Sequence, residues 1–87
     1  MKPRIWKYPL TIIHGQTIQI PATAKVLHVG LDPNDKPCLW ALLDPRETKV
    51  DRLVVVLGTG FDLNPLTPHH AGSFRDGRFM WHVFTNL

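Results

Sequence analysis

The sequence predicts an all-β protein: a compact antiparallel sandwich or small barrel of six to seven short strands, with little or no helix. Short segments rich in β-branched, aromatic and leucine residues alternate with turn residues along the whole chain, which is typical of small β domains. No window combines the helical spacing of apolar residues with capping residues at its ends. Six glycines and eight prolines are spread through the 87 residues rather than gathered in a linker, so we expect residues 1–87 to form one domain.

Each predicted strand ends at residues that break a strand or begin a turn. Pro21 cannot donate a ladder hydrogen bond, so the second strand ends or bulges there at a sheet edge. Two later turns both open with Asp-Pro, at Asp32 and Asp44. The best candidate for a helical turn is PRETKVD, at 45–51. The predicted strand segments are 4–10, 16–20, 24–31, 38–44 and 52–60, followed by the two arms of a hairpin within 73–84.

Asp76-Gly77 lies between two β-like flanks and is the best hairpin signal in the chain. Because side chains alternate along a strand, the loop residues fix which side chains meet across the hairpin. If Asp76-Gly77 forms a two-residue loop, Arg75 opposes Arg78 and Ala71 opposes His82.

Three predicted strands are apolar on both faces: LWALL, LVVVL and FMWHVF. In an antiparallel protein one face of a strand is usually buried and the other is wet. Three such strands imply an exposed apolar patch of a size that monomers seldom show. We therefore expect a homo-oligomer, in preference to a monomer whose own loops cover the second face. The expected interface residues are Trp40, Met80, His82 and Phe84.

The five histidines raise the question of a metal site, but their arrangement argues against one. In the hairpin register above, His70 is diagonal to His82 and points to the opposite face. No spacing of the kind found in zinc sites is present. We therefore expect no metal ion and no cofactor, and interpret His82 as a structural histidine. His69 and His70, in a segment (64–70) expected to be an irregular loop, are better placed to contact a ligand.

Two features favour an anionic ligand. Thr59 lies in the Gly-Thr-Gly turn that follows a predicted strand, where backbone amides can face a phosphate. Arg75 and Arg78 flank the hairpin tip beside phenylalanines, so they could grip a phosphate backbone or stack on a base. The plainer alternatives are that the glycines only bend the strand end and that the phenylalanines belong to the core.

Nothing in the sequence requires an enzyme. Almost all of the seven acidic residues lie in predicted turns, where aspartate has a local hydrogen-bonding role. Ser73 is the only serine and has no nucleophile-elbow context. Cys38 reads as a small buried hydrophobic residue and not as an activated thiolate. We name no catalytic residue and expect a binding protein rather than an enzyme.

Charge and cysteine content indicate the kind of partner and the cellular compartment. The formal net charge of +3 mildly favours anionic partners, and much of the excess lies near the N-terminus. The single cysteine allows no internal disulfide, which suits the reducing cytoplasm. No apolar run is long enough for a signal peptide or a membrane span, so we expect a cytoplasmic protein that does not contact a membrane.

The succession QTIQIP, AKVLHV, LWALLDP, GTG, HHAGSF and WHVF resembles a family of short, mostly uncharacterised proteins encoded by tailed phages and prophages. The segments at 39–42 and 81–84 are its most specific parts. The resemblance covers almost the whole chain and implies a β-rich fold and a location in the cytoplasm of the host cell. It implies no reaction and no catalytic residue.

Two classes of function fit these observations. The first is a small oligomeric binding protein that captures an anionic or nucleotide-like molecule, with sequestration of a host defence signal as one form. Its candidate ligand-binding residues are Thr59, His69, His70, Arg75 and Arg78. The second is a module that binds a nucleic acid or a host protein and has no small-molecule ligand.

Overall fold

The structure, a computed structural model, describes residues 2–63 and 69–87. Within these residues the chain forms seven strands and no helix, which confirms the all-β prediction. The strands are β1 (Arg4–Pro9), β2 (Gln16–Pro21), β3 (Lys25–Leu31), β4 (Pro37–Leu43), β5 (Lys49–Gly58), β6 (His69–Asp76) and β7 (Phe79–Thr85).

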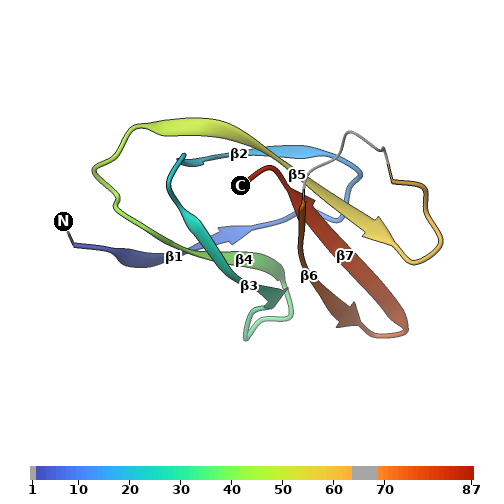
Figure 1. Cartoon of the computed structure of the whole chain (residues 1–87). Helices are drawn as coiled ribbons and strands as arrows, with labels where there is room; N and C mark the ends of the chain where they lie inside the picture. Colours follow the sequence, from blue (N-terminus) through green and yellow to red (C-terminus); the bar gives the residue numbers. More distant parts are fainter. Residues whose placement is uncertain (1, 64–68) are drawn as a thin grey trace.

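The strands form two antiparallel sheets that pack as a sandwich. Sheet A has three strands in the order β1-β4-β3, and sheet B has four in the order β2-β5-β7-β6. The molecule measures 41 × 32 × 15 Å, and Figure 1 shows the β6–β7 hairpin at the end away from the N-terminus. Pro21 is the last residue of β2, an edge strand, as its missing amide proton requires.

The core lies between the two sheets and is made by alternate residues of their strands. Leu39 and Ala41 of β4 belong to it together with Val54 of β5 and Val83 of β7, and all four are fully buried. Burying a large apolar side chain in this way stabilises a fold by roughly 1.5–3 kcal/mol. The period-two pattern of these strands therefore determines which of their faces turn inward.

Part of the outer side of β5 is covered within a single chain, although Leu53 on that side is 40 % exposed. Val55 and Leu57 face away from the core, because their neighbours Val54 and Val56 face into it. Even so, Val55 and Leu57 are each only 4 % exposed. Val55 and Leu57 therefore need no partner subunit to be buried.

Sheet A leaves more of its outer side open. Ile5 of β1 pairs with Leu42 of β4 on that side, and Ile5 is 60 % exposed. Trp40, two residues before Leu42, is half-buried and packs against His28 with ring centroids 5.5 Å apart. The open apolar surface expected from the two-faced strands is therefore found on sheet A.

The edges of the two sheets meet where β3 and β6 lie side by side. Gly72 of β6 permits this approach, because a Cβ atom there would overlap Cγ2 of Val29, a core residue of β3. The pairing of β6 with β7 is irregular between His70 and Gly72, so a β-bulge lies next to this contact. Gly72 and the β-bulge next to it therefore lie where the two sheets approach each other most closely at this edge.

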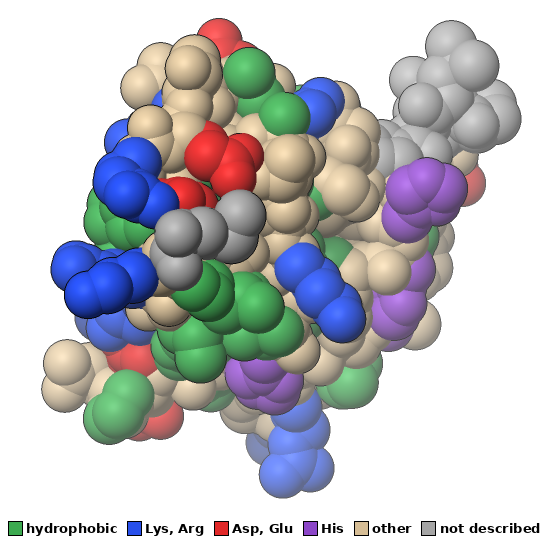
Figure 2. All heavy atoms as spheres, turned by 60° about the vertical axis from the view of Figure 1, so that its left-hand side comes forward, with side chains coloured by type: hydrophobic (Ala, Val, Ile, Leu, Met, Phe, Trp, Pro, Cys, Tyr) green, Lys and Arg blue, Asp and Glu red, His purple; other side chains and the backbone are tan. Residues whose placement is uncertain are grey.

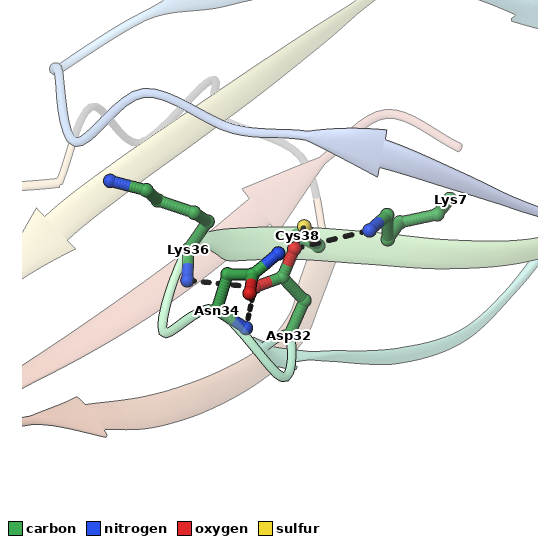
Figure 3. Close-up of polar contacts among 5 residues, drawn as sticks. All are labelled: Lys7, Asp32, Asn34, Lys36 and Cys38. Carbon is green, nitrogen blue, oxygen red and sulfur yellow. Dashed lines mark hydrogen bonds and ion pairs between the residues drawn. The ribbon is translucent and has the colours of Figure 1, made fainter.

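A buried carboxylate holds the first Asp-Pro turn, as Figure 3 shows. Asp32 Oδ1 accepts hydrogen bonds from the amides of Asn34 and Lys36 at 2.8 and 3.0 Å, and Oδ2 pairs with Lys7 Nζ of β1 at 3.1 Å. The Lys36 amide and the Lys7 ammonium hold the pKa of Asp32 below its usual value. The Cys38 thiol donates to the same Oδ2 over 3.8 Å, and burial, followed by the Asp32 charge, raises its pKa. Cys38 is thus a protonated, buried thiol, which agrees with its expected role.

The prediction of a helical turn at 45–51 is wrong. The Glu47 amide donates to the Asp44 carbonyl at 3.1 Å, which closes a β-turn, and β5 begins at Lys49. Asp44 also accepts hydrogen bonds from the amide and the guanidinium of Arg46. A side chain that bonds its own following backbone stabilises a turn in competition with a helix.

The predicted hairpin loop begins one residue too early, so the predicted cross-strand partners are wrong by two residues. The loop is Gly77-Arg78, so Asp76 pairs with Phe79 and Ser73 with His82. Gly77 has a φ of 61° at the first loop position, as in a type II′ turn, where the first residue takes the positive φ. An Asp-Gly loop would have placed the glycine second.

Candidate ligand-binding site

A groove at one end of sheet B combines exposed aromatic rings with an arginine. Phe61 and Phe79 are 68 % and 65 % exposed, although phenylalanine is among the residues most often buried. We name this surface the aromatic groove. Its volume is about 350 Å³, and it is lined by Gly58, Thr59, Phe61, Arg78, Phe79, Met80 and Trp81.

Three rings from two parts of the chain gather at the aromatic groove. The rings of Phe79 and Trp81 have centroids 6.0 Å apart and planes inclined at 34°. Both Trp81 and the third ring, Phe61, lie beside Gly58: a Cβ atom there would lie 3.3 Å from Trp81, a tight contact, and 3.6 Å from Phe61, an ordinary one. Flat apolar faces arranged in this way can stack on a planar molecule.

The hairpin loop brings Arg78 to the groove. Because Gly77 takes the positive φ at the first loop position, Arg78 stands at the second, directly before Phe79 at the start of β7. Arg75 instead pairs with Met80 and does not line the groove. The two arginines therefore do not oppose each other, and of the two it is Arg78 that belongs to the groove.

Beside the groove, four polar side chains form a hydrogen-bonded chain, which we name the Ser73 cluster. Ser73 Oγ lies 2.8 Å from Nδ1 of His82 and 3.0 Å from Nε2 of His70. The other ring nitrogen of His82, Nε2, lies 2.9 Å from Thr59 Oγ1. The strand register explains the central contact, because Ser73 of β6 is directly opposite His82 of β7. Thr59 belongs to both the cluster and the aromatic groove.

The structure divides the predicted ligand-binding residues between two pockets. Thr59 and Arg78 line the aromatic groove. His69 and His70 line a second pocket of about 320 Å³ between β3 and β6. Both histidines begin β6, so their prediction as loop residues is wrong. The rest of the loop predicted at 64–70 lies outside the described residues.

The four predicted interface residues do not share one surface. Met80, His82 and Phe84 alternate along the outer side of β7 on sheet B, whereas Trp40 is on the outer side of sheet A. Phe84 packs against His70 with ring centroids 5.2 Å apart. His82 is hydrogen-bonded, as expected of a structural histidine, but its partners belong to the same chain.

A third pocket, of about 440 Å³, lies near the N-terminus and is basic. It is lined by Lys2, Arg4, Asp44, Pro45 and Arg46. The guanidinium of Arg46 is paired with Asp44, which accepts hydrogen bonds from its Nε and Nη2 at 3.2 Å each. Lys2 and Arg4 are exposed. Figure 2 shows lysine and arginine side chains gathered on the side of the molecule that carries the N-terminus.

Two features of the site are not predicted from the sequence. Phe61 directly follows the Gly-Thr-Gly turn, and an aromatic residue in a turn is a signal that would have found it. The contact of Ser73 with His82 is missed because the predicted hairpin loop begins one residue too early. In the register predicted from Asp76-Gly77, Ser73 would oppose Met80 instead.

The family model described as Domain of unknown function (DUF7352) matches residues 1–87. The chain belongs to this family. The comparisons with curated proteins and with solved structures gave no match. The description of DUF7352 names no reaction and no ligand. The features of the structure that bear on function are the aromatic groove and the Ser73 cluster.

Among residues 2–63 and 69–87, no helix is long and apolar enough to cross a membrane. In the same described part of the chain, no three His, Cys, Asp or Glu side chains gather in a way that could hold a metal ion.

Proposed function

We propose that this protein captures a nucleotide-like anion in the aromatic groove. The observation that carries the proposal is the exposure of Phe61 and Phe79 in one groove that Arg78 also lines. Aromatic rings bind a nucleobase by stacking on its face, and a guanidinium pairs with phosphate through parallel hydrogen bonds. The volume of about 350 Å³ lies within the range of small-molecule sites.

The exposure of the two phenylalanines needs a reason in a chain this short. Burial of apolar surface stabilises a fold by roughly 25 cal/mol per Å², so rings left in water forgo that stabilisation. Clustered exposed apolar residues usually mark a binding surface. A planar ligand between the rings would recover the apolar contact, and a phosphate on that ligand would pair with Arg78.

The setting we propose is the cytoplasm of a host cell. It is supported by the resemblance to short phage and prophage proteins and by the single, buried cysteine. In that setting the capture would sequester a nucleotide signal of host defence. The ligand chemistry rests on the groove and does not depend on this setting.

The test is calorimetric titration of the purified protein with a nucleoside monophosphate, with the same nucleoside, and with inorganic phosphate. The nucleotide should bind more tightly than either fragment, because base and phosphate contact different side chains. Replacing Phe79 by leucine should weaken nucleotide and nucleoside binding by roughly 5- to 150-fold, which corresponds to about 1–3 kcal/mol for one base stacked on a ring.

The arginines supply a matched pair of variants. Arg78→Gln should weaken nucleotide binding and leave nucleoside binding unchanged, because only the phosphate contact is lost. Arg75→Gln removes a positive charge three residues away and should leave both affinities as in the parent. The proposal fails if the parent binds none of the three probes, or if the two arginine variants behave alike.

A nucleic-acid module is the second candidate, and the basic pocket with exposed Lys2 and Arg4 favours it. One base of a single strand would stack in the groove while neighbouring phosphates contact the cations. Each phosphate contact then contributes about 0.7 to the slope of log K against log salt concentration. A Lys2→Ala and Arg4→Ala variant that lowers this slope for a single-stranded oligonucleotide would favour the second candidate; an unchanged slope favours capture of a free nucleotide. Docking of a host protein would instead use the open apolar side of sheet A.

A further inference from the structure

Ser73 lies between two imidazoles, and a third side chain fixes the orientation of one of them. Its Oγ is 2.8 Å from His82 Nδ1 and 3.0 Å from His70 Nε2. On its far side, the His82 ring contacts the hydroxyl of Thr59 at 2.9 Å. A hydroxyl within hydrogen-bond reach of a base, with that base oriented by a third group, is the arrangement that activates a serine nucleophile.

The hydrogen bonds of the cluster run in one direction when both histidines are neutral. The Thr59 hydroxyl reaches the Met80 carbonyl at 3.5 Å, which accepts only, so Thr59 Oγ1 is free to accept from His82 Nε2–H. The unprotonated Nδ1 of His82 then accepts the hydroxyl proton of Ser73. Ser73 Oγ in turn accepts from Nε2–H of His70. In this assignment the basic nitrogen of His82 faces the hydroxyl of Ser73.

We propose that Ser73 is a nucleophile toward carboxylic esters, with His82 as its general base and Thr59 as a positioning residue. This activity is separate from nucleotide capture and does not rest on it. Ser73 and His82 are half-buried on the outer side of sheet B, where a reactant can approach them. Both are catalytic residues in this proposal, because both touch the reacting atoms.

The reaction balances without a co-reactant other than water. Ser73 Oγ forms a bond to the ester carbonyl carbon while its proton passes to His82 Nδ1. The bond from that carbon to the leaving oxygen then breaks, and the leaving oxygen takes the proton from Nδ1. Water, deprotonated by the same nitrogen, then attacks the acyl carbon, the bond from that carbon to Ser73 Oγ breaks, and Nδ1 returns the proton to Oγ, which releases a carboxylic acid and restores Ser73.

His70 supplies a hydrogen-bond donor beside the attacking oxygen, which becomes bonded to the carbon that carries the developing oxyanion. Its Nε2 lies 3.0 Å from Ser73 Oγ, and its N–H becomes available once Oγ has attacked the carbonyl. A donor next to the attacking oxygen can stabilise the oxyanion of the tetrahedral intermediate. His70 therefore stabilises the intermediate in addition to holding Ser73 in place.

The surroundings favour an uncharged acyl ester over a phosphoryl substrate. On the same side of β7, His82 is flanked by Met80 and Phe84, two apolar side chains. Within the described residues, none of the hydrogen bonds of the cluster involves a lysine or an arginine. Phosphoryl transfer depends on cations that neutralise the transferring group, whereas a short apolar acyl chain matches the side chains present.

The test is reaction of the purified protein with p-nitrophenyl butyrate, followed by intact-protein mass spectrometry and peptide mapping. We expect release of p-nitrophenol together with one butyryl group on Ser73. Ser73→Ala should abolish the adduct. His82→Gln should lower the acylation rate by about 10²- to 10⁴-fold, the usual contribution of a general base. His14→Gln, which removes an exposed histidine outside the cluster, should leave the rate unchanged.

Two further variants separate chemistry from folding. Ser73→Cys keeps a nucleophile at the same position and should still be acylated, which covers the case in which Ser73→Ala does not fold. Thr59→Ser should retain the rate and its pH profile, whereas Thr59→Val should lower the rate and shift the pH midpoint of acylation, an effect that a merely structural role would not produce. The proposal is overturned if folded parent protein carries no adduct at Ser73, or if Ser73→Ala is acylated as fast as the parent.

Discussion

At Asp32 a single carboxylate joins its own turn to another strand, because it accepts two backbone amides and pairs with Lys7. Those partners lower its pKa, so the charged form is favoured in the folded state. A group with a lowered folded pKa contributes stability above its unfolded pKa, which is about 3.9 for aspartate. That stability is lost as the pH falls through the lower folded pKa. We therefore predict that the urea midpoint of the parent falls below about pH 4.

Asp32→Asn tests the pH prediction directly. The amide cannot pair with Lys7 as a carboxylate does, so the variant should be less stable than the parent at pH 7. Its stability should also change less between pH 4 and pH 2, where Asp44, whose pKa is lowered by the hydrogen bond from Arg46, still titrates. Asp35→Asn, an exposed change in the same turn, is the control. Equal acid sensitivity of parent and Asp32→Asn would contradict the assigned role.

At the scale of the strand, the sequence predicts the elements well and their register poorly. β4 and β5 follow from runs of leucine and valine bounded by turn residues, since such runs favour a pleated, buried surface. The hairpin register depends on which loop position takes the positive φ, and the dipeptide Asp76-Gly77 permits a loop that begins one residue earlier. A shift of one residue changes every cross-strand partner. The pattern therefore predicts β6 and β7 but not the contact of Ser73 with His82.

The aromatic groove depends on contacts between elements and is correspondingly harder to predict. Arg78 and Thr59 are separate signals in the sequence, and the structure brings both to one groove. Phe61 and Trp81 come from different elements and both lie beside Gly58. Nothing in local spacing relates a turn after β5 to the start of β7. The sequence thus predicts several groove residues singly, but not the groove.

The contact between β3 and β6 predicts that substitutions of Gly72 and Val29 have coupled effects on the free energy of unfolding. Gly72→Ala should destabilise the fold by about 1–3 kcal/mol, the usual cost of overpacking, because its Cβ would overlap Cγ2 of Val29. Val29→Ala should also destabilise, because Val29 is buried. In the double variant the two costs should be less than additive by about 0.5–3 kcal/mol, since the overlap is relieved. Urea denaturation of the four proteins measures this coupling.

Gly15 provides the control for the glycine substitution. A Cβ atom there would lie 3.8 Å from Leu53 Cδ1, an ordinary contact. Gly15→Ala should therefore change the free energy of unfolding much less than Gly72→Ala does. If Gly72→Ala has no greater effect than Gly15→Ala, then β6 does not approach β3 as described.

For the whole molecule, the apolar surface that remains open predicts self-association through sheet A. Ile5 is 60 % exposed and lies beside Leu42 and Trp40, whereas Val55 and Leu57 on the outer side of β5 are already buried. Lys25 of β3, an exposed residue, pairs with Leu42 on the same side of sheet A, so two copies would bring like charges together. We predict a dimer or larger assembly at micromolar concentration, and tighter association at higher salt, which screens that repulsion.

Light scattering after gel filtration measures the subunit number. Ile5→Lys adds a charge at the centre of the proposed contact and should shift the population toward monomer. Ile13→Lys, at an exposed isoleucine outside the strands, should leave the assembly unchanged. A monomeric parent at every salt concentration would contradict association through sheet A.

The central claim, that a nucleotide-like anion binds in the aromatic groove, is tested most directly by the indole N–H resonances of the three tryptophans. Trp81 lines the groove, Trp40 lies on the outer side of sheet A, and Trp6 packs against the core beneath Lys49. Assignment by Trp81→Phe identifies the groove signal in a two-dimensional ¹H–¹⁵N spectrum. On titration with a nucleoside monophosphate, the Trp81 signal should shift and saturate while the other two stay in place. A Trp81 signal that stays unchanged, whether or not the others move, would contradict the claim.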